Sequence, residues 1–277
     1  MSNDPEVTVL MSVYNGLPYL QQAIESILQQ TCDNFEFLII DDGSTDGSDR
    51  ILTEYAQKDA RIKILSNKQN YGLGYSLARG LLIATTPWIA RMDADDVALP
   101  NRLELQMNYV RENPHVDIVG GYALDIDEGE CVLAERKVPT VHAEILRLIW
   151  TNPFIHGTVL FRRESILKIG SYSSQLAKRQ DYELWFRCAT AGIQFANLPI
   201  PLIYYRFTDN TFKRNNWKVA LTHVFIGWRG CWMVGASPFA YLAVTKQLVL
   251  CLLPSPLRTV VYFWLKRFDP RSKDKSN

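Results

Sequence analysis

Residues 91–96, RMDADD, bring four carboxylate or guanidinium groups into six positions, directly after the apolar run at residues 88–90. Asp93 and Asp95 lie two positions apart, so an extended chain would direct them to opposite faces, whereas a turn at a strand end can aim both at one point. Carboxylate oxygens grouped at one point suit Mg²⁺ or Mn²⁺. A D-x-D triplet taken alone is more often a solvated acidic loop, so its place in the chain must decide between the two.

The chain before this stretch alternates between strand-like and helix-like segments. Nearly continuous apolar runs, typical of strands buried on both faces of a parallel sheet, occur at residues 7–13, 35–40, 62–65 and 88–92. Apolar residues at helical spacing separate them. The alternation predicts an α/β fold with a twisted, mostly parallel sheet flanked by helices, whose ligands bind beyond the carboxyl ends of the strands. The polar residues at those ends are Tyr14, Asp41, Asp42, Asp93 and Asp95. Their shared position favours a binding site over a solvated loop.

Length and composition restrict the class of protein. A chain of 277 residues with 47% hydrophobic residues can form one large α/β domain or two small ones. The net charge of +1 gives no reason to expect a nucleic acid as partner. Five cysteines without a C-x-x-C pair and an acidic first segment, MSNDPEV, favour a reducing, cytoplasmic compartment. No apolar run reaches the roughly 18–20 residues that crossing a bilayer requires, so no membrane-spanning helix is expected.

Four segments carry a resemblance to a known family. They are SVYNGLPYLQQAIESILQQT at residues 12–31, FLIIDDGSTDGS at 37–48, NYGLGYSLARG at 70–80, and ARMDADD at 90–96 followed by LPNRLELQ at 99–106. In this order they resemble the nucleotide-binding half of the family 2 inverting glycosyltransferases with the GT-A fold. The resemblance covers residues 6–110 and continues more thinly to about residue 210.

The resemblance implies a nucleotide-sugar donor and a divalent metal, Mn²⁺ or Mg²⁺. The residues that it places at the nucleotide are Tyr14, Asn15, Asp41, Asp42, Arg91 and Asp93. Asp42 or its neighbour Asp41 would hydrogen bond the uracil edge, and Tyr14 would stack near the base. Asp93 and Asp95 would serve the ribose and the metal on the diphosphate. The family's usual Asn is replaced by Ala78, which affects the expected nucleotide contacts rather than the fold.

The second half resembles the part of the family that completes the chemistry. Asp181 matches the catalytic base of the family, although Gln180 replaces the usual Glu before it. Helix capping is the structural alternative for Asp181. On the acceptor side, the resemblance places His156, Gly157 and Arg206. A structural role for His156 is as strongly favoured as a functional one. Thr208 stands where the family often has a histidine, and this replacement predicts a weaker affinity for the metal.

The chain is expected to divide into a catalytic domain, residues 1–211, and a C-terminal amphipathic helical region, residues 212–277. The nucleotide-binding half would cover about 6–110 and the acceptor half about 111–211. Residues 254–277 hold six Lys and Arg against two Asp, a net of +4 that leaves −3 for the rest. Aromatic residues with flanking cations are typical of helices at a bilayer interface. We therefore expect peripheral attachment to the cytosolic face of an anionic membrane; the alternative is helices packed on the catalytic domain or a second subunit.

These patterns together predict an inverting glycosyltransferase of polysaccharide or glycolipid synthesis. It would move a sugar, most readily from a UDP-sugar, to a hydroxyl of a glycan or lipid-linked acceptor. A sugar-nucleotide pyrophosphorylase would need a Gly-rich, basic phosphate loop after the first strand, and YNGLP at residues 14–18 lacks the basic residues and repeated glycines of such a loop. A non-catalytic, membrane-bound nucleotide-sugar-binding module would have lost the base, and Asp181 argues against it.

Overall fold

The computed structural model describes residues 4–207 and 217–252. Its N-terminal half contains four parallel strands in the order β3-β2-β1-β4. These are β1 (Val7–Val13), β2 (Phe35–Asp41), β3 (Ile62–Ser66) and β4 (Trp88–Asp93). β1 and β2 are buried along almost their whole length, as their continuous apolar runs predict for strands covered on both faces.

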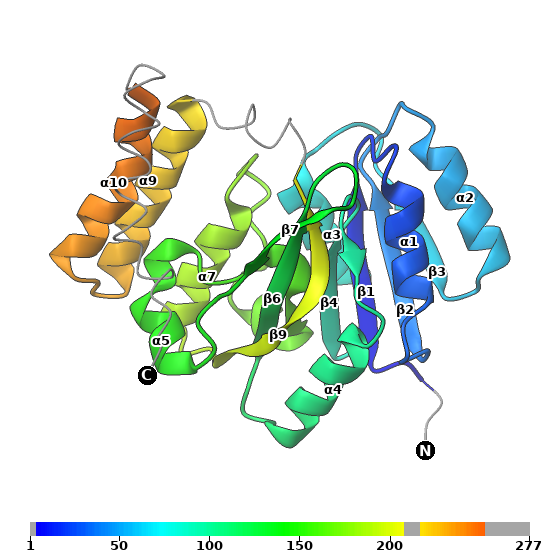
Figure 1. Ribbon diagram of the computed structural model, residues 1–277, viewed down its shortest axis with the longest axis horizontal. Coiled ribbons are helices and arrows are strands. Elements are labelled where there is room, and N and C mark those ends of the chain that lie inside the picture. Colours follow the sequence, from blue (N-terminus) through cyan, green and yellow to red (C-terminus); the bar gives the residue numbers. More distant parts are fainter. Residues whose placement is uncertain (1–3, 208–216, 253–277) are drawn as a thin grey trace.

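Helices cover the two faces of this half (Figure 1). They are α1 (Leu20–Leu28), α2 (Ser48–Lys58), α3 (Leu73–Ile83) and α4 (Arg102–Glu112). Alternate residues of β1 enter different cores: Val9 and Met11 pack with α1 in one, while Leu10 packs with α3 in the other. The two cores hold the sheet between its helix layers, and this packing sets the position of the strand ends.

The C-terminal half adds strands of both directions. β8 (Leu160–Arg162) lies antiparallel to β4, and the sheet continues through β6 (Ile118–Ile126), β9 (Phe195–Arg206) and β5 (Val97–Ala98). β7 (Val132–Arg136) extends the sheet from β6. The predicted α/β class with a helix-flanked sheet is confirmed. The parallel arrangement applies to β3-β2-β1-β4 and to the β6–β9 pair, whereas β8, β5 and β7 pair antiparallel.

Short elements connect these strands. They are α5 (His142–Arg147), the 3₁₀ helices η1 (Ile149–Thr151) and η2 (His156–Thr158), and α6 (Arg163–Lys168), followed by α7 (Gln180–Thr190). The final helices described, α9 (Trp217–Met233) and α10 (Pro238–Leu252), pack on each other and α9 packs on α7. Among the described residues, no helix has the length and apolarity to cross a bilayer. Thr208 and residues 253–277 of the expected basic tail lie outside the described residues.

Candidate active site

The predicted strand-end residues meet at one edge of the sheet. β1 lies between β2 and β4, with Val13 opposite Asp41 and Ser12 opposite Asp93. Because all three strands run parallel, their carboxyl ends project the residues that follow into a shared space. Tyr14, at the end of β1, is 49% exposed there. The structure therefore brings together the strand-end groups that sequence alternation placed at this edge.

The predicted nucleotide residue Asn15 links the ends of β1 and β2. Its backbone N–H donates to Ser44 Oγ at 3.0 Å, and its Oδ1 accepts from the backbone N–H of Thr45 at 2.8 Å. Its φ of 53° places it in the left-handed region, which asparagine tolerates better than most residues. Asn15 thus holds the loop that follows β2 against the end of β1.

The two aspartates that end β2 are both buried and hydrogen bonded. Asp42 Oδ1 accepts from Asn67 Nδ2 at 2.7 Å and from the Tyr71 N–H at 3.0 Å, and Oδ2 accepts from the Gly72 N–H at 2.8 Å. Asp41 Oδ1 accepts from the Ser44 N–H at 3.0 Å. These carboxylates therefore order the loops around the strand ends, and recognition of uracil by either one stays a prediction.

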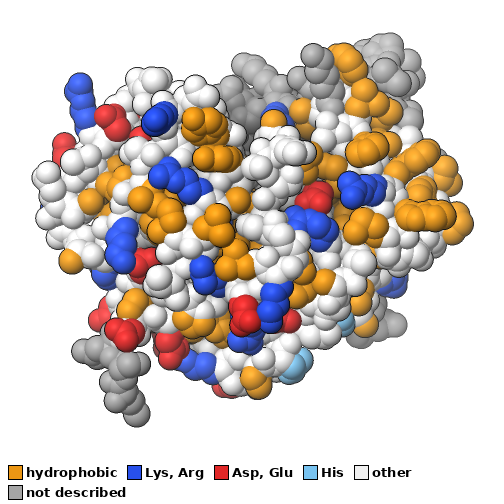
Figure 2. Space-filling view, turned by 180° about the vertical axis from the view of Figure 1, so that it is seen from behind, with side chains coloured by type: hydrophobic (Ala, Val, Ile, Leu, Met, Phe, Trp, Pro, Cys, Tyr) orange, Lys and Arg blue, Asp and Glu red, His pale blue; other side chains and the backbone are white. Residues whose placement is uncertain are grey.

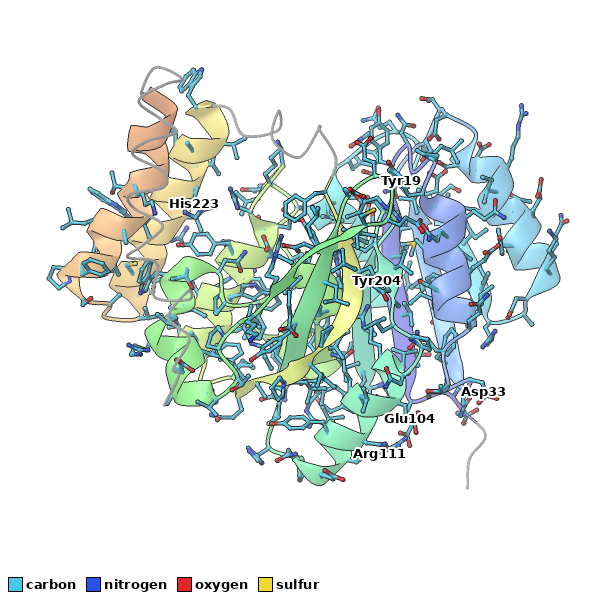
Figure 3. All side chains as sticks on the ribbon, viewed as in Figure 1. Tyr19, Asp33, Glu104, Arg111, Tyr204 and His223 are labelled. Atoms are coloured by element: carbon cyan, nitrogen blue, oxygen red, sulfur yellow. The ribbon has the colours of Figure 1, made fainter. Side chains whose placement is uncertain are left out.

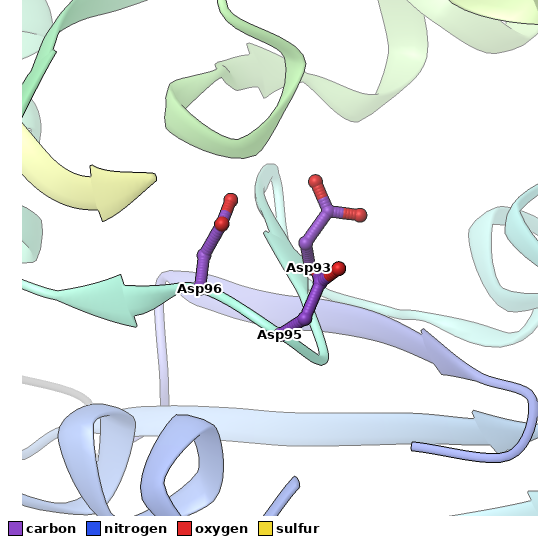
Figure 4. Close-up of side chains that lie close together, drawn as sticks. All are labelled: Asp93, Asp95 and Asp96. Carbon is purple, nitrogen blue, oxygen red and sulfur yellow. The ribbon is translucent and has the colours of Figure 1, made fainter. Parts of the chain in front are cut away.

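Three acids at the end of β4 form a cluster that could hold a divalent cation. One carboxylate oxygen from each of Asp93, Asp95 and Asp96 lies within 4.8 Å of the others (Figure 4). Asp96 Oδ1 accepts from the Arg206 N–H at 2.9 Å, but its Oδ2 is buried with no hydrogen-bond partner. Burial, and then the charges of Asp93 and Asp95, raise the pKa of Asp96 well above its usual value. A bound cation would give Asp96 Oδ2 a partner and would reduce the repulsion among the three carboxylates, so the residues present fit a hard divalent metal.

Asp93 has a second role in this cluster. Its carboxylate forms an ion pair with the guanidinium of Arg91, whose side chain is 2% exposed. Burial alone would lower the pKa of Arg91, but Asp93 raises it above its ordinary value. The Arg91 carbonyl in turn accepts from Arg102 Nη2 at 2.7 Å. The predicted nucleotide residue Arg91 therefore orients Asp93.

The structure places Gly157 and Arg206, two of the residues expected on the acceptor side, directly against the acidic cluster. A Cβ on Gly157 would lie 2.9 Å from Asp96 Oδ2 and 3.4 Å from Asp93 Oδ2. Arg206 Nε donates to the Asp95 carbonyl at 3.1 Å, and its guanidinium lies 4.3 Å from the ring centroid of Tyr19, whose place at the start of α1 is seen in Figure 3. The Arg206 contact joins residues far apart in the chain and shapes the turn that carries Asp95.

Asp181 lies in the first turn of α7 and is held from another element. Its Oδ2 accepts from Asn152 Nδ2 at 2.9 Å. The N-cap of α7 is Arg179, without a side-chain cap hydrogen bond, so Asp181 is not the capping residue. Asn152 and Arg179 both have left-handed backbones, with φ of 57° and 66°. Asparagine tolerates this region better than most residues, and the role of Asp181 as a reacting group stays a prediction.

A buried tyrosine, Tyr172, contacts His156, the residue that precedes Gly157. Burial raises the pKa of the Tyr172 phenol, Arg91 acts against this rise, and the charges of Asp181 and Asp93 add to it. Its Oη lies 2.9 Å from His156 Nε2. Burial, and then Arg91, lower the pKa of His156 well below its usual value, so the imidazole is neutral. His156 thus contacts Tyr172, and its expected place on the acceptor side stays a prediction.

Three residues of this site received no role from the sequence. Asp96 directly follows Asp95 in the DADD stretch, and this adjacency is the signal that could have marked it as a further oxygen ligand. Asn152 precedes Pro153, and an Asn-Pro pair is a turn signal that could have marked its backbone. Tyr172 stands in no recognisable pattern, because its importance comes only from its neighbours in space.

Comparisons with known proteins show the family of this chain. The sequence profile of the family described as Glycosyl transferase family 2 matches residues 8–170. The putative glycosyltransferase EpsE of Bacillus subtilis (strain 168) is 33% identical over 262 residues, 92% of each chain. The amylovoran biosynthesis glycosyltransferase AmsE of Erwinia amylovora is 33% identical over 222 residues, 78% of this chain and 82% of AmsE.

Solved structures share the fold. The crystal structure of S. aureus TarS 1–349 in complex with UDP-GlcNAc has a TM-score of 0.68 at 17% identity, and covers 89% of this chain and 71% of that one. The mannosyltransferase PcManGT from Pyrobaculum calidifontis, in complex with GDP-Man and Mn²⁺, has a TM-score of 0.64 at 17% identity, with 97% and 82% covered. The profile match and the identity to EpsE over nearly the whole chain confirm the family that the four motifs predicted. This chain belongs to glycosyl transferase family 2 and is a glycosyltransferase with the GT-A fold.

Proposed function

We propose that this glycosyltransferase moves a sugar from a UDP-sugar to a hydroxyl of a glycan or lipid-linked acceptor with inversion at the anomeric carbon. The observation that carries the proposal is the cluster of Asp93, Asp95 and Asp96 at the end of β4; the carboxylate of Asp181, held by Asn152, is a second and separate acid. Asp93, Asp95 and Asp96 could bind the metal on the leaving diphosphate. Asp181, which is separate from them, could accept the proton of the acceptor hydroxyl.

The donor and acceptor classes draw on the relatives. TarS was solved with UDP-GlcNAc, which supports a uridine donor bound at the ends of β1, β2 and β4. AmsE acts in amylovoran biosynthesis, which supports a growing polysaccharide or its lipid-linked precursor as the acceptor. Tyr14 is exposed at the end of β1, and we assign it to stack near the base.

The residues that would hold a divalent metal are Asp95, Asp93 and Asp96. When bound there, Mn²⁺ or Mg²⁺ offsets the charge that develops on the leaving diphosphate. Arg206 holds the backbone of Asp95 and Arg91 holds the carboxylate of Asp93, so the protein fixes the ligands before the donor arrives. The Mn²⁺ complex of PcManGT supports this assignment.

Asp181 would act as the general base. The acceptor hydroxyl gives its proton to the Asp181 carboxylate while its oxygen forms the new bond to the anomeric carbon. The bond from that carbon to the diphosphate oxygen breaks on the opposite side, and UDP leaves with the bonding electrons. Asn152 donates a hydrogen bond to one carboxylate oxygen of Asp181 and so positions the carboxylate. Because the acceptor oxygen attacks the anomeric carbon directly, the reaction forms no covalent intermediate with the enzyme.

A donor panel tests the proposal. We expect binding of UDP, and slow hydrolysis of one UDP-sugar, to require Mn²⁺ or Mg²⁺ and to disappear with EDTA. A non-catalytic module would bind the nucleotide sugar without hydrolysing it or transferring the sugar. A pyrophosphorylase would consume pyrophosphate and release UTP. Either result, or donor turnover that is indifferent to EDTA, would contradict the proposal.

Gly157→Ala provides a separate test of the metal site. The new Cβ would lie 2.9 Å from Asp96 Oδ2, so Asp96 must shift. We expect the Mn²⁺ affinity measured with UDP present to fall by about tenfold, the lower end of effects seen when groups around a metal are disturbed. Gly129→Ala is the matched control, because its Cβ would meet only Asp127 Oδ1 at an ordinary 3.4 Å. Equal Mn²⁺ affinity in both variants would contradict the assignment of Asp96.

We further propose that residues 1–211 form the catalytic domain, and that the region from residue 212 attaches the enzyme to the cytosolic face of an anionic membrane. Support comes from the sequence: the net charge of +4 in residues 254–277 is interleaved with aromatic side chains. Attachment would bring a lipid-linked acceptor close to the enzyme.

A further inference from the structure

The exposed side of α9 carries a continuous stripe of large apolar side chains. Its members are spaced at intervals of three and four, which places them on one side of a helix, and they are Trp217, Leu221, Phe225, Trp228 and Trp232. Phe225 is 70% exposed and Trp232 81% exposed. On α10, Phe239 and Leu242 are also exposed. We call this set the α9 face, and Figure 2 shows hydrophobic side chains gathered at the edge of the molecule that α9 and α10 form.

The other side of α9 is fully used in packing. A Cβ on Gly230 would lie 2.2 Å from Phe186, so the backbone of α9 approaches α7 too closely for any side chain there. His223, labelled in Figure 3, stacks on Tyr182 with ring centroids 4.7 Å apart. The exposed apolar residues therefore lie on the outer side of a helix whose inner side already packs on α7.

The charge of residues 217–277 indicates what kind of partner binds the α9 face. Residues 217–252 contain Lys218, Arg229 and Lys246 and no Asp or Glu. Residues 217–277 hold nine Lys and Arg against two Asp, a net of +7, whereas residues 1–216 hold 21 against 27 acids, a net of −6. Net positive charge is thus confined to the part of the chain that carries the α9 face. A second copy on this face would bring two positive regions together, whereas an anionic lipid surface would attract them.

We infer that the α9 face is the surface through which this enzyme docks on anionic phospholipid. The inference rests on the proposed membrane attachment and deepens it, because it narrows the contact surface from the whole region after residue 211 to the α9 face. Trp and Phe side chains would enter the headgroup boundary, and Arg229, four residues after Phe225, would meet phosphate at the border of the stripe. Since α9 packs on α7 through Tyr182, docking also sets the distance between the bilayer and the helix that carries Asp181.

The test is flotation of the full chain with vesicles of phosphatidylcholine, with or without phosphatidylglycerol. We expect the wild type to float with the anionic vesicles and to float less at high salt. The double variant Phe225→Glu, Trp232→Glu should bind these vesicles at least about tenfold more weakly, because two apolar anchors become charged. The matched control is Leu82→Glu, Leu133→Glu, which changes side chains that are 68% and 59% exposed on α3 and β7, and it should float like the wild type.

Different failures have different meanings. If the α9 variant floats as well as the wild type while the wild type prefers anionic vesicles, the inference about α9 is wrong and the proposed membrane attachment survives. If the wild type does not float, both are wrong. If sedimentation shows a wild-type dimer that the α9 variant dissociates, the occupant is a second copy. UDP binding measured on the same samples tests the catalytic proposal separately, because the α9 variant should bind UDP like the wild type.

Discussion

Replacing Asp181 by Asn is expected to lower the turnover number by about 10²–10⁴-fold, with little change in the affinity for the nucleotide sugar. The amide has the size of the carboxylate but cannot accept the proton of the acceptor hydroxyl. The first turn of α7 should keep its structure, because Asp181 is not the N-cap residue. Steady-state kinetics with a transferable donor, together with UDP titration, separate turnover from binding.

The matched control for this change is Glu183→Gln, another acid-to-amide change in the same helix. Glu183 pairs with Arg187 at 2.8 Å, and it has no proposed part in catalysis. We expect this variant to keep its turnover. Near-native turnover in Asp181→Asn would show that the base is elsewhere, and loss of donor binding in that variant would instead indicate a structural role for Asp181.

Asp95→Ala is expected to remove the metal dependence of donor binding and most of the activity. The change deletes a carboxylate from a cluster whose oxygens lie within 4.8 Å of each other, while the Asp95 carbonyl that accepts from Arg206 is retained. A strand-end acid adds little to the core, so the melting temperature should stay close to that of the wild type. Loss of one ligand should weaken the metal-dependent affinity for UDP by at least about tenfold.

Calorimetric titration of UDP with and without Mn²⁺ measures this effect. Glu54→Ala is the control for a general loss of negative charge, because Glu54 is exposed on α2, away from the strand ends. An Asp95→Ala protein that binds UDP with unchanged affinity and unchanged Mn²⁺ dependence would contradict the assignment. A large fall in melting temperature would show that Asp95 is structural.

Sequence alone determined the fold class, the family and the edge of the sheet at which the site lies. Continuous apolar runs interrupted by helical spacing predict parallel strands, and parallel strands end at one edge. Asp41 and Asp93 were therefore expected at the same edge, and the register of β1 with its two neighbours places them on either side of the end of β1. The four motifs lie in the same half, where strands and helices alternate regularly along the chain, so local patterns were sufficient to recognise the elements.

The tertiary structure alone decided the surroundings of the reacting groups. Two contacts cannot be read from the spacing of residues: Arg206 with the Asp95 carbonyl, and Gly157 with Asp96. Each depends on how β9 and η2, which come later in the chain, pack against the turn that follows β4. The same holds for Asn152 beside Asp181. Burial and hydrogen bonding are set by groups brought in from distant parts of the chain. A sequence can therefore name the acids of this enzyme, but only the fold determines which of them are charged, paired or held in place.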